Sequence, residues 1–382
     1  MSDLLRQEIA AVADTIVIKV GTRVLTHANG TLDMDRIAHL AEEICWLRAA
    51  RRKVALVSSG AVGAGMSQLG LTVRPTDVAQ LQAVAAIGQT RLIEAYDRTL
   101  RKHDRLAAQV LLTADDLDNR TRYLNVRNTI RSLMDYGSIP IINENDTVAV
   151  DELVATFGDN DHLAALVTNL LRAPLLIILS DVEGLYDGDP RRSESRLIPV
   201  VTKLDSSILA CVRDAHPGVS RGGMASKLDA ARIVVTAGEN VIIASGRNPS
   251  VLREIIRGEP TGTALLAQGK SISPRKRWIG FSAQVCGAVI LDNGACDALV
   301  QQGRSLLPIG ILRTEGEFRK GDLVAIRDAE GHEFARGLTN YHAGDVERIK
   351  GLRSDRIAQV LGQCPYEEVI HRDNMTVLEL GE

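Results

Sequence analysis

Short apolar segments alternate with longer amphipathic segments from residue 15 to residue 257, and this alternation constrains the fold more than any other feature of the sequence. Apolar runs such as Thr15–Val20 have the length of buried strands, whereas Asp33–Arg51 repeats its apolar residues at the spacing of one helix face. Strands that alternate with helices predict a mainly parallel sheet with right-handed crossovers. We therefore expect an α/β fold in which a doubly wound, mainly parallel open sheet lies between layers of helices.

The predicted elements of this region follow one another without an internal repeat. Strands are expected at 15–20, 53–57, 106–112, 139–142, 174–179 and 240–244. Helices are expected at 33–51, 77–103, 119–136, 225–237 and 248–257. One more helix is expected directly after the polar residues Gly158-Asp159-Asn160-Asp161.

The pattern changes after residue 258, where the segments become short and turn residues such as Asp292-Asn293-Gly294 separate them. This texture predicts a small β-rich domain. We expect an α/β domain at 12–260, a linker at 261–281 and the β-rich domain at 282–370. The apolar segments of the last domain are Gly287–Leu291, Leu306–Pro308, Leu323–Arg327, Ala335–Leu338 and Thr376–Leu380.

Composition excludes several classes of protein. The net charge of −3 argues against a general polyanion binder, which is normally basic. The apolar runs are too short to span a membrane, and the first residues lack the features of a signal peptide. The five cysteines are odd in number and form no CxxC pair, so we expect reduced thiols in a cytoplasmic protein, with no disulfide framework or zinc site.

Two polar clusters follow the apolar run Ile139–Ile142 and suggest a ligand site. They are Asn143-Glu144-Asn145-Asp146 and Gly158-Asp159-Asn160-Asp161, and the second precedes a helical pattern that Asp159 or Asn160 is suited to cap. In an open α/β sheet, ligands bind where strands end and helices begin. Amides and carboxylates together suit an amino acid that carries both charges. The alternative is that these residues only form turns, because Asn and Asp side chains bond their own backbone.

Three further segments are candidates for binding a phosphate. Lys19 is the one charge within its apolar run and precedes the turn Gly21-Thr22, although a lysine there could equally lie on an exposed face. The glycine-rich segment Ser58–Gly65 follows a strand, but tight packing of the next helix would explain its glycines as well. The segment Val219–Lys227 places two glycines and a lysine at a helix start, which is typical of an anion site.

The motifs occur together in one order along the chain. They are IVIKVGT (Ile16–Thr22), VSSGAVGAG (Val57–Gly65), PIINEND (Pro140–Asp146), GDND (Gly158–Asp161), LSDVEGLYDGDPR (Leu179–Arg191) and GGMASK (Gly222–Lys227). In this combination the chain resembles the glutamate 5-kinase family of the amino acid kinase superfamily over most of residues 15–257. The remainder resembles a PUA domain, which many bacterial members carry at the C-terminus.

The resemblance implies the amino acid kinase fold and ATP-dependent phosphorylation of the side-chain carboxylate of L-glutamate to L-glutamyl 5-phosphate, the first step of proline biosynthesis. It implies catalytic roles for Lys19, Lys227 and Asp161, with Asp161 orienting the lysines. Glutamate is expected to bind at Ser59, Asp146 and Asn160. The implied ATP-binding positions are Lys19, Ser180, Asp181, Arg221, Gly222, Gly223, Met224, Ala225, Ser226 and Lys227. Mg²⁺ is expected to be carried by the nucleotide phosphates, with no metal site on the protein.

One position departs from the family pattern, because Arg221 stands where a threonine is usual before the glycine pair. An arginine there could meet a phosphate strongly, or it could point into solvent. Ser226, where threonine is commoner, keeps its hydroxyl.

Other functions and partners stay open at this point. The runner-up is a kinase of the same superfamily that acts on carbamate, aspartate or a nucleoside monophosphate. An RNA-binding role is an alternative, because PUA domains occur in RNA-binding proteins and the segment SISPRKR at 271–277 is basic. Acidic and basic residues are roughly balanced from Ser271 onward, which weakens that reading. The resemblance also implies feedback inhibition by proline and a homo-oligomer, either a dimer or a tetramer.

Overall fold

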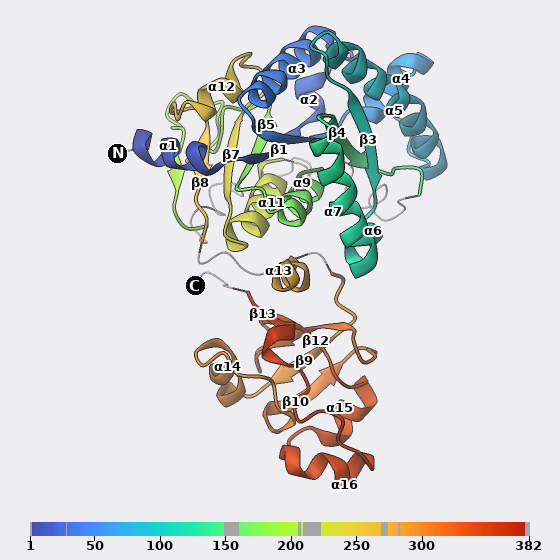
Figure 1. The fold of residues 1–382 in the computed structure, drawn as a ribbon, viewed down its shortest axis with the longest axis vertical. Helices are drawn as coiled ribbons and strands as arrows, with labels where there is room; N and C mark the ends of the chain where they lie inside the picture. The colour runs from blue at the N-terminus through green and yellow to red at the C-terminus, as the bar shows by residue number, and fades with distance from the viewer. Residues whose placement is uncertain are drawn as a thin grey trace. The chain divides into compact units, whose positions relative to one another are not determined.

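The computed structural model describes residues 2–27, 29–148, 160–204, 208, 223–268, 274–281 and 283–378. The chain forms two compact units, Met1–Ser271 and Ile272–Glu382 (Figure 1). Each unit has its own hydrophobic core, as the two textures of the sequence predict. No helix among these residues is long and apolar enough to cross a membrane.

The first unit is built on a sheet whose described strands lie in the order β3-β4-β2-β1-β5-β7-β8-β6. Its strands are β1 (Thr15–Val20), β2 (Lys53–Ser58), β3 (Ala107–Leu112), β4 (Ile139–Glu144), β5 (Leu175–Ser180), β6 (Val200–Val201), β7 (Asn240–Ser245) and β8 (Thr263–Leu265). The strands from β3 to β7 in this order pair in parallel, and β8 pairs with β7 in the antiparallel direction. The prediction of a mainly parallel α/β sheet is therefore confirmed.

Helices cover both faces of this sheet (Figure 1). They are α1 (Ser2–Val12), α2 (Thr22–Leu25), α3 (Met34–Ala49), α4 (Ala61–Leu69), α5 (Val78–Arg101), α6 (Ala114–Asp118), α7 (Arg120–Asp135), α9 (Asn160–Leu171), α11 (Met224–Thr236) and α12 (Val251–Ile256). On one face α3 packs against α5 and α12, and on the other α9 packs against α7 and α11. Because both faces are covered, the central strands are mostly apolar, and β1 is buried from Ile16 to Val20, Lys19 included.

Several helices begin where the sequence supplies a capping side chain. Asp33 accepts a hydrogen bond from the backbone N–H of Arg36, and Asp77 does the same for Gln80. Asn119 caps α7 in the same way. These local signals explain why the predicted starts of these three helices, at 33, 77 and 119, agree with the structure to within one residue.

The strand order reverses at the centre of the sheet. The chain leaves β1 towards β2, β4 and β3, and then returns to pair β5 with the other side of β1. Ligands bind at such a reversal of strand order, outside the carboxyl ends of the strands. The segments that follow Lys19 on β1 and Leu179 on β5 therefore meet at this edge.

The boundaries of the first unit differ from the predicted 12–260. The unpredicted helix α1 is anchored by Arg6, which is 1% exposed and donates hydrogen bonds to backbone carbonyl groups. The acceptors are Pro199, Thr261 and Gly262. At the other end, β8 belongs to the sheet, although it falls in the predicted linker 261–281. Helix α1 is amphipathic, but it precedes the first strand and so lies outside the strand–helix alternation on which the prediction was based. The three-residue strand β8 is too short to show a periodicity.

The second unit is a β-rich domain whose described strands lie in the order β10-β9-β11-β12-β13. They are β9 (Gly287–Leu291), β10 (Ile311–Glu315), β11 (Leu323–Arg327), β12 (Glu333–Leu338) and β13 (Met375–Val377). The helices are α13 (Pro274–Phe281), α14 (Asn293–Val300), α15 (Ala343–Ile349) and α16 (Ile357–Leu361), with short 3-10 turns at 308–310, 354–356 and 372–374. Because α13 packs against β12 and β13, the linker is shorter than predicted.

Two predictions within this domain were wrong. Asp292-Asn293-Gly294 is not a simple turn, because the Asp292 side chain accepts from the Ala295 N–H and starts α14. The segment at 306–308 is not a strand, since Leu306 makes only an isolated bridge with Ile370 before a 3-10 turn. Asp serves a turn and a helix cap equally well, so the residue type alone does not distinguish them.

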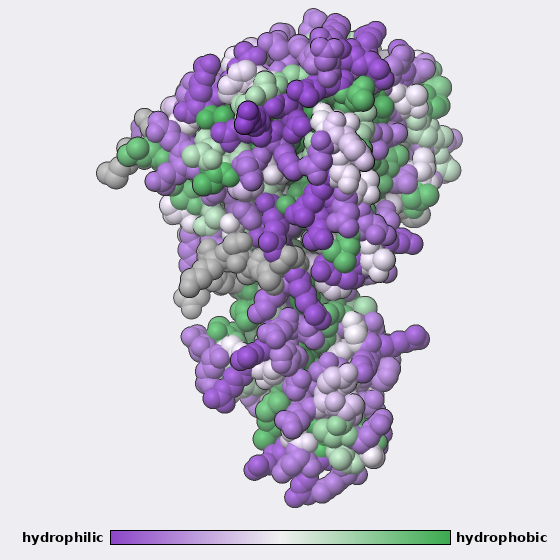
Figure 2. Space-filling model, viewed as in Figure 1, coloured by the Kyte–Doolittle hydropathy of each residue, from purple (hydrophilic) through white to green (hydrophobic). Residues whose placement is uncertain are grey.

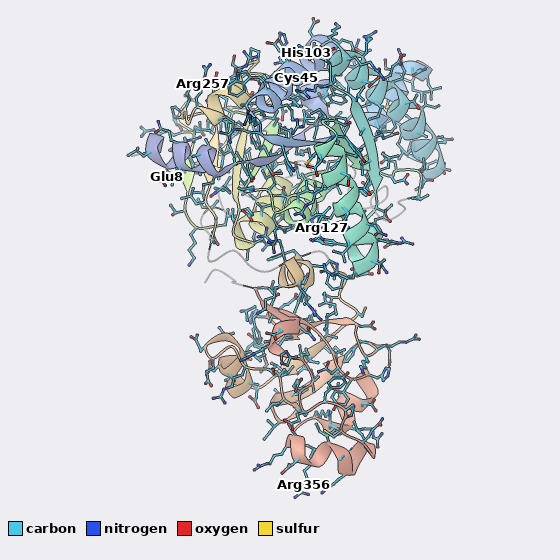
Figure 3. The ribbon with its side chains drawn as sticks, viewed as in Figure 1. Glu8, Cys45, His103, Arg127, Arg257 and Arg356 are labelled. Carbon is cyan, nitrogen blue, oxygen red and sulfur yellow. The ribbon has the colours of Figure 1, made fainter. Side chains whose placement is uncertain are left out.

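The surface is mainly hydrophilic, and the thiols of two cysteines are partly buried. Figure 2 shows a face on which hydrophilic side chains predominate and apolar ones are scattered in small groups. Cys45 lies on α3 (Figure 3), and Cys296 lies on α14. Burial raises the pKa of both thiols, that of Cys296 to about 11, so they are protonated and unreactive near neutral pH. Cys211 lies outside the described residues.

Candidate active site

The most unusual polar feature of the first unit is a buried carboxylate between two ammonium groups. Asp161, in the first turn of α9, lies 2.6 Å from the Nζ of Lys19 on β1 and 3.1 Å from the Nζ of Lys227 on α11. All three side chains are at least 90% buried. Ser226 also donates to Asp161, at 3.2 Å. The structure therefore brings together the residues that the resemblance implied to be catalytic.

The two lysines control the charge of Asp161. Burial by itself would raise the pKa of its carboxyl, but the positive charges of Lys19 and Lys227 hold that pKa below the ordinary value of 3.8. Asp161 is consequently ionised at neutral pH. One carboxylate between two lysines leaves a net positive charge in the crevice, which favours an anionic ligand.

Packing of two helices explains why Lys227 reaches this place. Helices α9 and α11 pack against each other on one face of the sheet (Figure 1). Both begin near the carboxyl ends of the strands, so their first turns carry Asp161 and Lys227 towards Lys19. Helix α11 starts after Gly223, which has no side chain to cap the first N–H groups. Met224 and Ala225 follow, and an uncapped helix start attracts an anion. Arg221 and Gly222 lie outside the described residues.

Ser180 and Asp181 follow β5 at the same edge of the sheet. Gly21, which follows β1, donates its N–H to the carbonyl of Leu179 and so holds the two strand ends together. Asp181 also pairs with Arg23 of α2, at 3.2 Å. Burial would raise the pKa of Asp181, but the Arg23 contact and hydrogen bonding hold it below 3.8. The exposed guanidinium of Arg23 is a charge at this site that the sequence did not reveal.

A chain of buried amide groups lies beside α9. The Nδ2 of Asn160 donates to the Oγ of Ser59 and to the Oδ1 of Asn143, both at 2.9 Å. The Nδ2 of Asn143 donates in turn to the Oε1 of Gln89 on α5, at 2.7 Å. These four side chains are between 3% and 7% exposed. Within the described part of the chain, the Oδ1 of Asn160 and the Nε2 of Gln89 have no hydrogen-bond partner.

Ser59 connects this amide chain to the start of α4. Gly60 precedes the helix with a φ of 111°, a left-handed conformation that glycine adopts without strain, and no side chain caps the first turn. The positive end of α4 therefore lies next to the Ser59–Asn160 contact. A carboxylate could be bound there by backbone N–H groups and by the Ser59 hydroxyl.

Asp146 lies in the turn after β4 and is partly exposed. Its carboxylate acts electrostatically on the guanidinium of Arg74. Asp146 therefore stands nearer to solvent than Asn160 and Ser59, the other two predicted glutamate-binding residues.

A metal site on the protein is not evident in the described ranges. No group of three or more His, Cys, Asp or Glu side chains is placed there to hold an ion. The crevice instead offers ammonium groups and N–H groups, which suit phosphate oxygens. That Mg²⁺ travels with the nucleotide remains a prediction.

Comparison with known proteins identifies the family. The amino acid kinase family model matches residues 14–245, and the PUA domain model matches residues 287–361. The chain belongs to the amino acid kinase family. This kinase is 48% identical to a glutamate 5-kinase of Rhodopirellula baltica over 373 residues, covering 98% of this chain and 96% of that one. A glutamate 5-kinase of Caldanaerobacter subterraneus is 47% identical over 368 residues, covering 96% of this chain and 98% of its own length.

Among solved structures, the kinase is similar to a carbamate kinase from Giardia lamblia bound to AMP-PNP. That chain is 21% identical, with a TM-score of 0.49, and the match covers 68% of this chain and 100% of the other. The family and PUA assignments confirm the resemblance drawn from the sequence motifs.

Sequence reasoning missed three side chains that border the site of this kinase. Gln89 lies within a long helix, where a glutamine carries no signal of function. Asn143 was part of a recognised polar cluster but received no role. Arg23 follows the first strand, and its partner Asp181 is 158 residues away along the chain. Only the fold shows that these residues border the site.

Proposed function

We propose that this kinase transfers the γ-phosphoryl group of ATP to the side-chain carboxylate of L-glutamate, giving ADP and L-glutamyl 5-phosphate, the first step of proline biosynthesis. The observation that carries the proposal is the buried carboxylate of Asp161 between Lys19 and Lys227. Close relatives named glutamate 5-kinase, which match nearly the whole chain, support the choice of substrate.

The chemistry requires little beyond charge and position. A glutamate carboxylate is already ionised at neutral pH, so the reaction needs no general base. Bringing that carboxylate to a triphosphate sets one anion against another, and phosphoryl transfer depends mainly on positioning and electrostatic stabilisation. Lys19 and Lys227 would flank the transferring group and offset its charge. Asp161 would hold both ammonium groups in place.

The two ends of the crevice would then bind different substrates. Ser180, Asp181 and the start of α11 (Gly223–Lys227) would bind the nucleotide. Ser180 ends β5 next to β1, and the first turn of α11 carries Lys227 to Asp161. Mg²⁺ bound to the phosphates would supply further neutralising charge. Ser59, Asn160 and Asp146 would bind the amino acid.

Coupled measurement of ADP release tests the proposal. The kinase is incubated with ATP and with L-glutamate, aspartate, carbamate or uridine monophosphate in turn. We expect L-glutamate alone to accelerate ADP release strongly and to yield an acyl phosphate that hydroxylamine traps. A stronger response to another acceptor would overturn the assignment of substrate while leaving the kinase chemistry intact.

The remaining expectations concern regulation and partners. Proline has the α-amino and α-carboxyl groups of glutamate, so we infer that it competes in the Asn143–Asn160 region and raises the KM for glutamate. Assembly into a dimer or tetramer and a cytoplasmic location stay predictions. RNA binding by the PUA domain is the less favoured alternative, and a labelled RNA that shows no mobility shift at moderate salt would exclude it.

A further inference from the structure

We propose that Gln89 is a positioning residue that makes Asn160 present its amide oxygen to the α-ammonium group of the amino-acid substrate. The inference rests on the proposed function and concerns how the site recognises an amino acid rather than a simple dicarboxylic acid. Gln89 would act through Asn143, because it contacts Asn143 and not Asn160.

The order of donors and acceptors carries the argument. An amide side chain has an oxygen that accepts and a nitrogen that donates two hydrogen bonds. The Oε1 of Gln89 accepts from the nitrogen of Asn143, so the oxygen of Asn143 faces Asn160. That oxygen takes one donor of the Asn160 nitrogen, and Ser59 takes the second. The side-chain oxygen of Asn160 is then the one atom of this amide group that accepts no hydrogen bond from the described residues.

That oxygen is a buried acceptor without a donor among the described residues. Asn160 is 6% exposed, so bulk water does not satisfy it. A buried acceptor favours a ligand that brings a donor, and the α-ammonium of an amino acid is a charged donor of this kind. If Asn160 were turned over, its nitrogen would face the ammonium and repel it.

Close packing of α5 on α4 keeps Gln89 in place. A Cβ atom on the preceding residue, Gly88, would lie 1.7 Å from the carbonyl oxygen of Ala61 and 2.4 Å from the N of Gly65. The two helix backbones therefore touch directly at this point. Gln89 is consequently held beside the start of α4, where Ser59 and Asn160 meet.

Two variants at one position separate the proposed role from simple packing. Gln89→Glu keeps an oxygen that can accept from Asn143, whereas Gln89→Leu has similar bulk and no acceptor. Gln80→Leu is the matched control, because it makes the same change at an exposed position of the same helix. Steady-state kinetics are measured with L-glutamate and with glutarate, the same acid without its ammonium group.

We expect Gln89→Leu to raise the KM for glutamate about tenfold, while kcat and the KM for ATP change by less than about twofold. The preference of the enzyme for glutamate over glutarate, as a ratio of kcat/KM values, should fall about tenfold as well. Gln89→Glu should retain most of that preference, and Gln80→Leu should retain all of it.

Each other outcome overturns the inference. An unchanged preference in Gln89→Leu would show that the residue does not orient Asn160. Equal losses for glutamate and glutarate would indicate a structural role only. Failure of the proposed function is distinguishable, because the unmodified kinase would then show no glutamate-dependent ADP release at all.

Discussion

Replacing Asp161 by asparagine tests the central feature of the structure, the carboxylate shared by two lysines. The substitution keeps the shape of the side chain and removes its charge, so two buried ammonium groups lose their counter-ion. At an effective dielectric constant of about 20, ion pairs of 2.6 Å and 3.1 Å correspond to attractions of about 6 and about 5 kcal/mol. Desolvation of the three groups opposes these attractions. We therefore expect the free energy of unfolding to fall by about 3–5 kcal/mol at neutral pH, as for other broken buried ion pairs.

The pH dependence of this difference has a definite sign. The folded-state pKa of Asp161 lies below its ordinary value of 3.8, so the carboxylate stabilises the folded state above that pH. This stabilisation is lost as the pH falls from 3.8 through the lower folded-state pKa. The stability difference between the unmodified protein and Asp161→Asn should therefore be largest near neutral pH and should shrink below pH 3.8.

Urea unfolding followed by tryptophan fluorescence measures the free energy of unfolding, and the signal must come from the first structural unit, which contains Asp161. The chain has two tryptophans, Trp46 in the first unit and Trp278 in the second, so a Trp278→Phe background leaves Trp46 as the only reporter. Asp135→Asn is the control, because Asp135 pairs with Lys53 at a similar 2.7 Å but on the exposed surface. That control should leave the urea midpoint almost unchanged. Equal shifts for Asp161→Asn and Asp135→Asn would refute the reasoning, since burial would then play no part.

Four further substitutions test other parts of the structure. Lys227→Ala should lower kcat by a factor on the order of 10² or more, as for the loss of one transition-state donor, and unchanged turnover would remove this lysine from the mechanism. Asp146→Ala should mainly raise the KM for glutamate, and a change confined to the KM for ATP would show that the two halves of the site are reversed. Gly88→Ala should lower the free energy of unfolding by about 1–3 kcal/mol or more, because its Cβ overlaps the backbone of α4, whereas Gly344→Ala meets nothing within 4 Å and should change little. Burial raises the pKa of Glu43 above 4.5, so the contribution of Glu43 to the free energy of unfolding should decline as the pH rises above 4.5. Glu43→Gln should abolish that decline. If the free energy of unfolding in urea had the same pH slope in the variant and in the unmodified protein, the expectation would be contradicted.

The sheet of this kinase could be predicted from the sequence because its signals are local. A few neighbouring residues are enough to identify an apolar run such as Leu175–Leu179 or a capped amphipathic helix such as Met34–Ala49. The alternation of the two then leaves few arrangements other than a parallel sheet covered on both faces. Asp292 shows the limit of such signals, because a residue that suits both turns and caps was assigned to the wrong one.

The site itself could be predicted only in part. The motifs and the family resemblance singled out Lys19, Asp161 and Lys227, and the fold places Asp161 2.6 Å from the Nζ of Lys19 and 3.1 Å from the Nζ of Lys227. They did not indicate Gln89 or Arg23, whose side chains gain a role only through their partners. Gln89 is 54 residues from Asn143 along the chain, and no periodicity relates the two positions.

The sequence by itself determined which segments become strands and helices and which of them carry charge, because hydrophobic spacing and capping act over one or two turns of chain. Only the tertiary structure decided which side chains meet, since a contact depends on strand order, register and helix packing together. Lys19 and Lys227 illustrate the difference. The sequence shows Lys19 before a glycine turn and Lys227 at a helix start after two glycines, but their shared carboxylate exists only where β1, α9 and α11 converge.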